Sequence, residues 1–249
     1  MAAVLHDNLA DDAAVLAGTQ VVTTPATMVQ NEHVARKWRS RLSSDYLLFD
    51  FGASTAIDTV AAIGLTATTC RVRLSTADSS GAAGDAWDTG VVAVDQGYLQ
   101  VIALGEATAS GRYLRIDLVN AAGDYVECGR VAAGVRSTFT YNFAFGWGRA
   151  WVDPSLRTKT RGGQTQISRE ENYRTLELPF EIVSTDDRHG FVETMDRVNG
   201  LSTDVLFVTD DGSANLARDS VWGLVADVSP VTQPFFDTFA KTYRIEERL

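Results

Sequence analysis

The sequence has little of what enzymes, membrane proteins and cross-linked secreted domains require. Its 249 residues include two cysteines and three histidines. No run reaches the roughly 18 apolar residues of a membrane span, and the first residues lack the basic and apolar regions of a secretory signal. A net charge of -10 argues against binding to nucleic acid or to an anionic membrane. We therefore expect no nucleic acid partner, no membrane insertion and no signal-dependent export.

The scarce reactive residues do not form a recognisable site. His6, His33 and His189 lie in different segments, and no zinc, phosphate-loop or nucleophile motif is present. Carboxylate pairs such as Asp186-Asp187 are explained by turns and helix starts. We therefore expect no enzyme, no catalytic residues, no metal site and no cofactor. A calcium ion held by loop oxygens in the first half is the alternative.

The two cysteines, Cys70 and Cys128, each lie in a strand-like run. Two cysteines cannot make the disulfide framework of a small secreted domain. We expect two buried, reduced thiols, and a disulfide between them is the alternative.

The first half predicts a β-sandwich built from short strands and turns. Residues 45–52 and 57–65 are two successive strands by pattern, and residues 70–77 alternate with Val72 and Leu74 on one face. The stretch 111–134 alternates, turns at residues 122–124 and resumes as a strand, which predicts an antiparallel hairpin.

The composition changes after Gly134 from Ala- and Gly-rich turns to strands dense in aromatic residues. We therefore place a domain boundary near residues 134–142. The second half is rich in strands, with one helix predicted over Thr185–Gly200, whose apolar face is Phe191, Val192, Met195 and Val198. Aromatic residues gather just after the boundary, where Phe143, Phe145, Trp147 and Trp151 are either core or interface anchors.

The run RTKTRGG holds Arg157, Lys159 and Arg161 in an otherwise acidic chain. One interpretation is a solvated hairpin loop with both glycines at the bend. The other is a charged contact with an acidic neighbour, because symmetric rings often pair unlike surface patches. We take these three residues as a candidate subunit interface.

Two families resemble the two halves. The first half, with ARKWRS ahead of LLFDFG, then CRVRLS, GRYLRIDL and CGRVAAG, resembles the discoidin-like, galactose-binding-like jelly rolls of tail proteins of long-tailed bacteriophages. The second half, with RGGQTQIS, YRTLELPFEIVS, DVLFVTDD and a terminal YRIEERL, is similar to the ring-forming β domain of phage distal tail proteins. The resemblance implies a mainly β protein: a discoidin-like jelly-roll β-sandwich over residues 1–136, then a distal-tail-like β domain with one short helix over residues 137–249.

That resemblance implies a structural virion protein of the tail tip or baseplate. Its partners would be further copies of itself in a homo-oligomeric ring, the tail tube protein and the hub or other baseplate proteins. It would be assembled in the host cytoplasm and reside at the tail tip of the virion.

The alternative function is a carbohydrate-binding module that reads a host-surface glycan. Sugar-binding discoidin-like domains carry aromatic and polar groups on loops at one end of the sandwich. Here the loop GDAWDTG offers Trp87 with Asp85 and Asp88 as a candidate glycan contact, in which the indole stacks on a sugar ring and the carboxylates accept its hydroxyls. The opposing interpretation is a Trp87 that covers the end of the sandwich.

Overall fold

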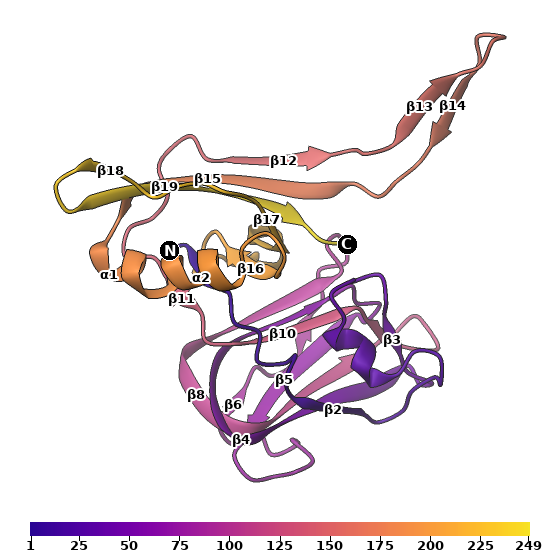
Figure 1. Ribbon diagram of the computed structural model, residues 1–249. Helices are drawn as coiled ribbons and strands as arrows, with labels where there is room; N and C mark the ends of the chain where they lie inside the picture. Colours follow the sequence, from indigo (N-terminus) through magenta and orange to yellow (C-terminus); the bar gives the residue numbers. More distant parts are fainter. The chain divides into compact units, whose positions relative to one another are not determined.

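The computed structural model describes residues 1–249, which form a mainly β protein of two compact units (Figure 1). The first unit comprises Met1–Thr138 and Leu206–Ser220, and the second comprises Phe139–Val205 and Val221–Leu249. The first stretch of the first unit ends at Thr138. The return of Leu206–Ser220 to the first unit was not predicted. Independent folding of the two halves stays a prediction.

The first unit is a jelly-roll β-sandwich. Its elements are β1 (Ala3–Leu5), β2 (Ala14–Ala17), 3-10 helix η1 (Ala26–Gln30), β3 (Trp38–Arg39), β4 (Ser44–Ile63), β5 (Thr69–Ser75), β6 (Trp87–Asp88), β7 (Val92–Ala93), β8 (Gln100–Val119), β9 (Glu127–Cys128), β10 (Arg130–Gly134), β11 (Ser137–Thr138) and α3 (Leu216–Asp219). The main sheet has the order β10-β4-β8-β5-β6, with β2 on β4 and β7 on β5. In addition, β1 pairs with β11 and with β16 (Val205–Val208).

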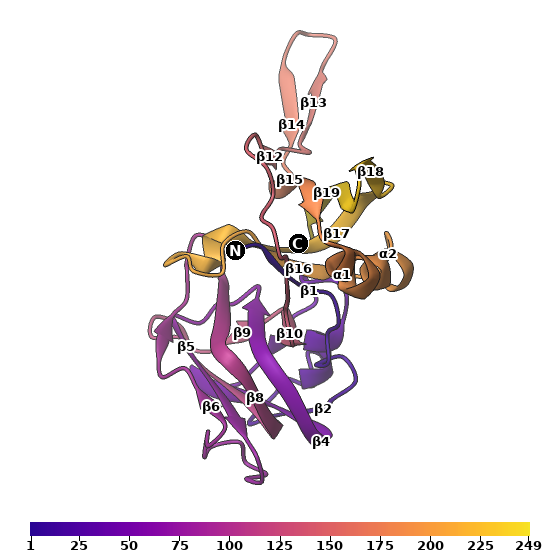
Figure 2. The same ribbon diagram turned by 90° about the vertical axis from the view of Figure 1, so that its left-hand side faces the viewer.

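Two strands of 20 residues, β4 and β8, run the length of this sandwich and pair with each other (Figure 2). The prediction of two separate strands over residues 45–52 and 57–65 was therefore wrong. The register shifts between Asp50 and Thr55, and Gly52 lies in the left-handed region with φ +76°. Such an irregularity bends a strand without ending the ladder, so the small polar residues there mark a bulge and not a turn.

The predicted hairpin over residues 111–134 was also wrong, although its strands exist. β8 pairs with β4 and β5, whereas β9 pairs with β3 and β10 with β4. The long strand β4 has two edges, and β8 takes one while β10 takes the other. Alternation had correctly shown which side chains face inward, because Leu114, Ile116 and Leu118 are fully buried. It carries no information about which strand lies alongside.

Both cysteines are free and lie in the core of the sandwich, as predicted. Burial raises the pKa of the Cys128 thiol to about 12, and burial also raises the pKa of Cys70. Neither thiol is a nucleophile near neutral pH.

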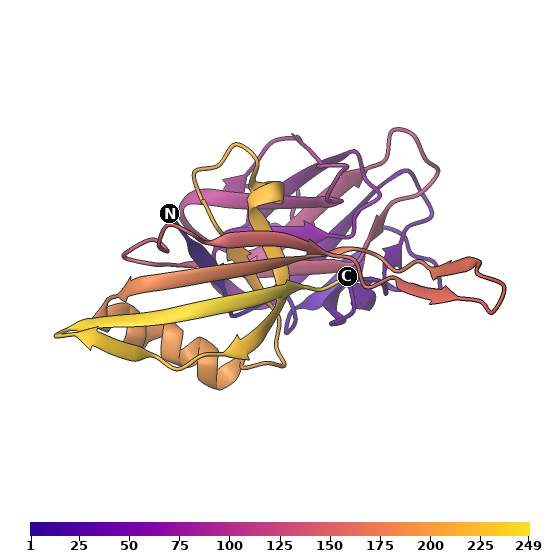
Figure 3. The ribbon, with the colours of Figure 1, turned by 90° about the horizontal axis from the view of Figure 1, so that it is seen from above.

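The second unit is a β-sheet with a helical segment on one face (Figures 1 and 3). Its strands are β12 (Gly148–Val152), β13 (Leu156–Lys159), β14 (Thr165–Ser168), β15 (Tyr173–Val183), β17 (Ser220–Val228), β18 (Thr232–Phe235) and β19 (Thr238–Glu247). The sheet has the order β17-β19-β15-β12, and β18 pairs with β19. Figure 3 shows β12, β15 and β19 running side by side.

The helix predicted over Thr185–Gly200 is present as α1 (Thr185–Asp187), π-helical η2 (Arg188–Val192) and α2 (Glu193–Val198). Ser184 caps its start, since the Ser184 Oγ accepts a hydrogen bond from the Asp187 amide at 3.0 Å. Val192 and Met195 are buried as predicted. Val198 is 60% exposed, so its assignment to the buried face was wrong. The wider η2 turn before it explains the shift, because a π turn rotates later residues around the helix.

Candidate functional site

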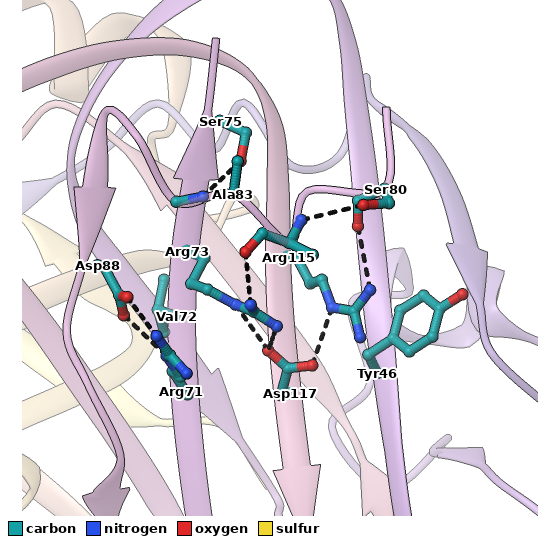
Figure 4. Close-up of polar contacts among 12 residues, drawn as sticks. Tyr46, Arg71, Val72, Arg73, Ser75, Ser80, Ala83, Asp88, Arg115 and Asp117 are labelled. Carbon is teal, nitrogen blue, oxygen red and sulfur yellow. Dashed lines mark hydrogen bonds and ion pairs between the residues drawn. The ribbon is translucent and has the colours of Figure 1, made fainter. Parts of the chain in front are cut away.

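The outer face of the jelly-roll sheet carries a network of arginines and carboxylates (Figure 4). Asp117 of β8 accepts hydrogen bonds from Arg73 of β5 at 2.6 and 3.1 Å on one oxygen. Its other oxygen accepts a hydrogen bond from Arg115 at 2.8 Å. Arg115 also stacks on the Tyr46 ring, 3.7 Å from the ring centroid. Cross-strand pairing places all four side chains on the same face of the sheet.

The two arginines hold the loop between β5 and β6 against the sheet. Arg73 donates to the Ala82 carbonyl at 2.6 Å, and Arg115 donates to the Ser80 carbonyl at 3.1 Å (Figure 4). Gly81 lies between these two carbonyls with φ +67°, and a Cβ there would lie 2.7 Å from the Cβ of Arg115. The close approach of the loop therefore requires glycine at this position.

Asp85 and Asp88, two of the candidate glycan contacts, already have partners within the protein. Asp85 accepts hydrogen bonds from the Thr76 amide, at 3.1 Å, and from the Thr76 hydroxyl. Asp88 accepts from Arg71 at 3.0 and 2.5 Å. The Thr76 hydroxyl lowers the pKa of Asp85, and the Arg71 guanidinium lowers the pKa of Asp88. Both carboxylates are therefore ionised and tie the loop to β5.

Trp87 faces away from Asp88, because successive residues of a strand point to opposite faces of a sheet. Trp87 pairs with the buried Leu74, and Asp88 pairs with Arg73 on the outer face. The Trp87 side chain is half-buried, packs against the core and lines a hollow of about 520 Å³. The structure thus does not bring Trp87 and Asp88 together, and glycan contact by these residues stays a prediction.

The hollow beside Trp87 exposes polar and apolar surface in similar amounts. Its other lining residues include Val92, Val94, Leu104 and Leu216, with the polar side chains Thr89, Asp95, Gln100 and Asn215 among them. A small-ligand site also combines an aromatic side chain with polar groups, although its lining is predominantly apolar. No local sequence pattern predicts this hollow, because its walls come from segments more than a hundred residues apart.

The basic residues Arg157, Lys159 and Arg161 lie on a projecting two-stranded hairpin, Leu156–Ser168, which we call the arm (Figures 1 and 2). Arg157 is opposite Ile167 and Lys159 is opposite Thr165, so both basic side chains share one face. Arg161 lies in the turn, where Gly163 has φ +81°. Lys159 and Arg161 have no acidic partner within the protein, whereas the pKa of Asp153 is lowered by the Ser155 hydrogen bonds and, after them, by the charge of Arg157.

All side chains of β13 and β14 are exposed, including two large apolar ones. Leu156 is 68% exposed and Ile167 is 53% exposed. A two-stranded hairpin without further packing is at best marginally stable in water. The arm therefore has the properties of a segment that another surface covers.

Further aromatic side chains are exposed elsewhere on the second unit. Phe143 packs against Trp147 and Phe180, with ring centroids 5.2 and 5.9 Å apart. Phe145 and Trp151 are exposed. Of the residues predicted to be either core or interface anchors, Phe143 thus packs within the second unit, whereas Phe145 and Trp151 are exposed.

No group of three or more His, Cys, Asp or Glu side chains lies close enough to hold a metal ion. His6 is half-buried, and burial lowers its pKa. His189 is exposed, with its Nδ1 3.7 Å from a Glu193 carboxylate oxygen. No helix in the structure has the length and apolar character needed to cross a membrane.

No family model and no curated protein matches the sequence. Solved structures similar to part of it include a family 32 carbohydrate-binding module of C. perfringens in complex with galactose, with 9% identity and a TM-score of 0.44 over 55% of this chain and 100% of the module. The lectin domain of lectinolysin complexed with Lewis b antigen has 12% identity and a TM-score of 0.42 over 53% and 98%. A fucose-binding module of Streptococcus pneumoniae has 8% identity and a TM-score of 0.42 over 52% and 98%. The ligands named here belong to those modules.

Proposed function

We propose that the protein is a structural assembly protein, and not an enzyme, whose second unit forms a homo-oligomeric ring through the arm. The observation that carries this proposal is the arm itself: an exposed hairpin with two uncovered apolar side chains and three exposed basic ones. A neighbouring copy supplies the packing that the arm lacks within one chain. The positive charge of the arm within an acidic chain suits pairing with an acidic neighbour.

The proposed setting is the tail tip of a long-tailed bacteriophage, and it rests on the sequence resemblance of the second half to distal tail proteins. In that setting the ring joins the tail tube protein to the hub and adhesion apparatus. The protein is assembled in the host cytoplasm and is located at the tail tip of the finished virion.

The test is the mass of the full chain in solution, measured by light scattering after size exclusion. We expect an oligomer, and we expect the triple reversal Arg157→Glu, Lys159→Glu and Arg161→Glu to convert it to monomer with an unchanged melting temperature. The matched control, Arg36→Glu, Lys37→Glu and Arg41→Glu, makes the same change of charge in the first unit and is expected to remain oligomeric. A wild-type chain that is monomeric at every concentration contradicts the proposal.

A second candidate function is carbohydrate binding by the first unit, with a host-surface glycan as partner. The half-buried indole of Trp87 in a hollow of about 520 Å³ favours it. Calorimetry with soluble glycans tests it. Loss of binding in Trp87→Ala with unchanged melting, while Trp151→Ala binds normally, supports a sugar site. A parent protein that binds no glycan, together with a destabilised Trp87→Ala, makes Trp87 a core residue.

A further inference from the structure

The hollow beside Trp87 carries one charged side chain, Asp95, and none of its other lining residues is acidic or basic. The Asp95 Oδ1 accepts hydrogen bonds from the Gly97 and Tyr98 amides, at 2.8 and 3.3 Å. Its Oδ2 accepts none within the protein, and Asp95 makes no ion pair. The hollow thus contains a negative charge that no ion pair of the protein balances.

Gln100 adds an oxygen acceptor beside this carboxylate. Asp95 and Gln100 lie opposite each other across a tight turn, so their side chains are neighbours on one face of it. The Gln100 side chain is buried, and its Nε2 donates to the Ala217 carbonyl and, at 3.3 Å, to the Ser220 carbonyl. Both amide hydrogens are used in this way, whereas the Oε1 receives no hydrogen bond from the protein. That oxygen is available as an acceptor on the wall of the hollow.

A protonated amine matches this pair of acceptors. It carries three N–H donors and one positive charge, so it can donate to Asp95 and to Gln100 together. A hydroxyl has a single hydrogen and can donate to only one of them. Arg218, the basic residue that follows Ala217 in the chain, lies over the Tyr98 ring, 5.9 Å from its centroid, and makes no salt bridge with Asp95.

We propose that the hollow beside Trp87 binds an amino sugar, with the protonated amine of the sugar held by Asp95 and Gln100. This inference rests on the second candidate function, carbohydrate binding by the first unit, and names the class of sugar. The Trp87 indole supplies the surface on which the sugar ring stacks, and the exposed amide of Asn215 is available to the ring hydroxyls. A neutral sugar leaves the Asp95 charge without a partner, so the site discriminates between sugars by charge.

Calorimetry of the full chain with glucosamine, N-acetylglucosamine and glucose tests this inference, because these sugars differ at one ring substituent. At about pH 6 the free amine is protonated. We expect glucosamine to bind at least about fivefold more tightly than either neutral sugar, because its hydrogen bonds are charge-assisted.

The variant Asp95→Asn removes the charge and keeps an oxygen acceptor for the Gly97 and Tyr98 amides. We expect it to bind glucosamine and glucose equally well. The matched control Glu106→Gln removes one exposed charge outside the hollow, and we expect it to keep the preference for glucosamine.

The position of the site is measured in the wild-type chain, so that the test does not depend on the folding of a variant. We expect glucosamine to shift the side-chain amide signals of Gln100 and the indole N–H signal of Trp87 in NMR spectra. Binding of glucosamine that shifts neither signal overturns the inference.

The outcomes separate this inference from carbohydrate binding as such. Equal binding of all three sugars leaves carbohydrate binding in place and overturns the amine site. A preference for glucosamine that persists in Asp95→Asn, or that disappears in Glu106→Gln, also overturns the amine site. A chain that binds other glycans but none of these three overturns the inference alone, and a chain that binds no glycan overturns both.

Discussion

Arg73 of β5 and Asp117 of β8 are joined on the outer face of the jelly roll by hydrogen bonds of 2.6 and 3.1 Å. The same carboxylate binds Arg115, and both guanidinium groups reach carbonyls of the loop between β5 and β6. A single carboxylate thus fixes, through two arginines, the loop that leads to Trp87.

We predict that Asp117→Asn lowers the free energy of unfolding by about 2 kcal/mol, because two largely buried guanidinium groups lose a charged acceptor. Urea denaturation measures the change, and hydrogen exchange at the Ser80 and Ala83 amides is expected to speed up as the loop loosens. The control Asp124→Asn alters an exposed carboxylate without a partner. Equal urea midpoints for Asp117→Asn and wild type contradict the prediction.

We predict that Gly81→Ala is more destabilising than Gly90→Ala. Both glycines have a left-handed φ, which costs an alanine about 1 kcal/mol. A Cβ at Gly90 meets nothing within 4 Å, whereas one at Gly81 lies 2.7 Å from Arg115 and 2.9 Å from Leu48. The urea midpoints of the two variants, measured side by side, test this prediction. A lower midpoint for Gly90→Ala than for Gly81→Ala contradicts it.

We predict that acid destabilises the first unit through the carboxylates of the loop. Hydrogen bonds from the Ser80 amide lower the pKa of Asp78 below its ordinary 3.8, and the Thr76 hydroxyl lowers that of Asp85. Because the folded-state pKa values are depressed, their stabilisation is complete above the unfolded pKa and is lost as pH falls through the folded one. Thermal melts from about pH 7 to about pH 2.5 measure this loss. We expect Asp78→Asn to reduce the fall of melting temperature at acid pH, and the control Asp12→Asn to leave that fall unchanged.

We predict that neither thiol reacts with iodoacetamide near pH 8 while the protein is folded. Burial raises the pKa of Cys128 to about 12 and also raises that of Cys70, so almost no thiolate is present. Mass spectrometry is expected to show two modified cysteines after denaturation in urea and none before. Rapid modification of the native protein would show that the core opens readily.

The sequence determined much of the local structure. Alternation in residues 113–118 and in residues 70–77 identified the buried side chains of β8 and β5. Gly200 correctly marked the end of the helix, whereas its capping residue, Ser184, was not predicted. The basic run at Arg157 to Arg161 indicated a hairpin bend. These features follow from period, propensity and turn chemistry, which act over a few residues.

Tertiary structure decided the pairings and the sites. β8 pairs with β4 and β5 because distant strands compete for the same edges, and no local pattern records which one wins. The register of β6 on β5 decides that Trp87, and not Asp88, lies on the face of the buried Leu74. The hollow at the arm base exists because an antiparallel hairpin returns Arg169, Glu170 and Glu171 to Asp153 and Arg157. The register of the strands, and which distant segments come together, depend on long-range packing. They are therefore properties of the fold and not of any short segment.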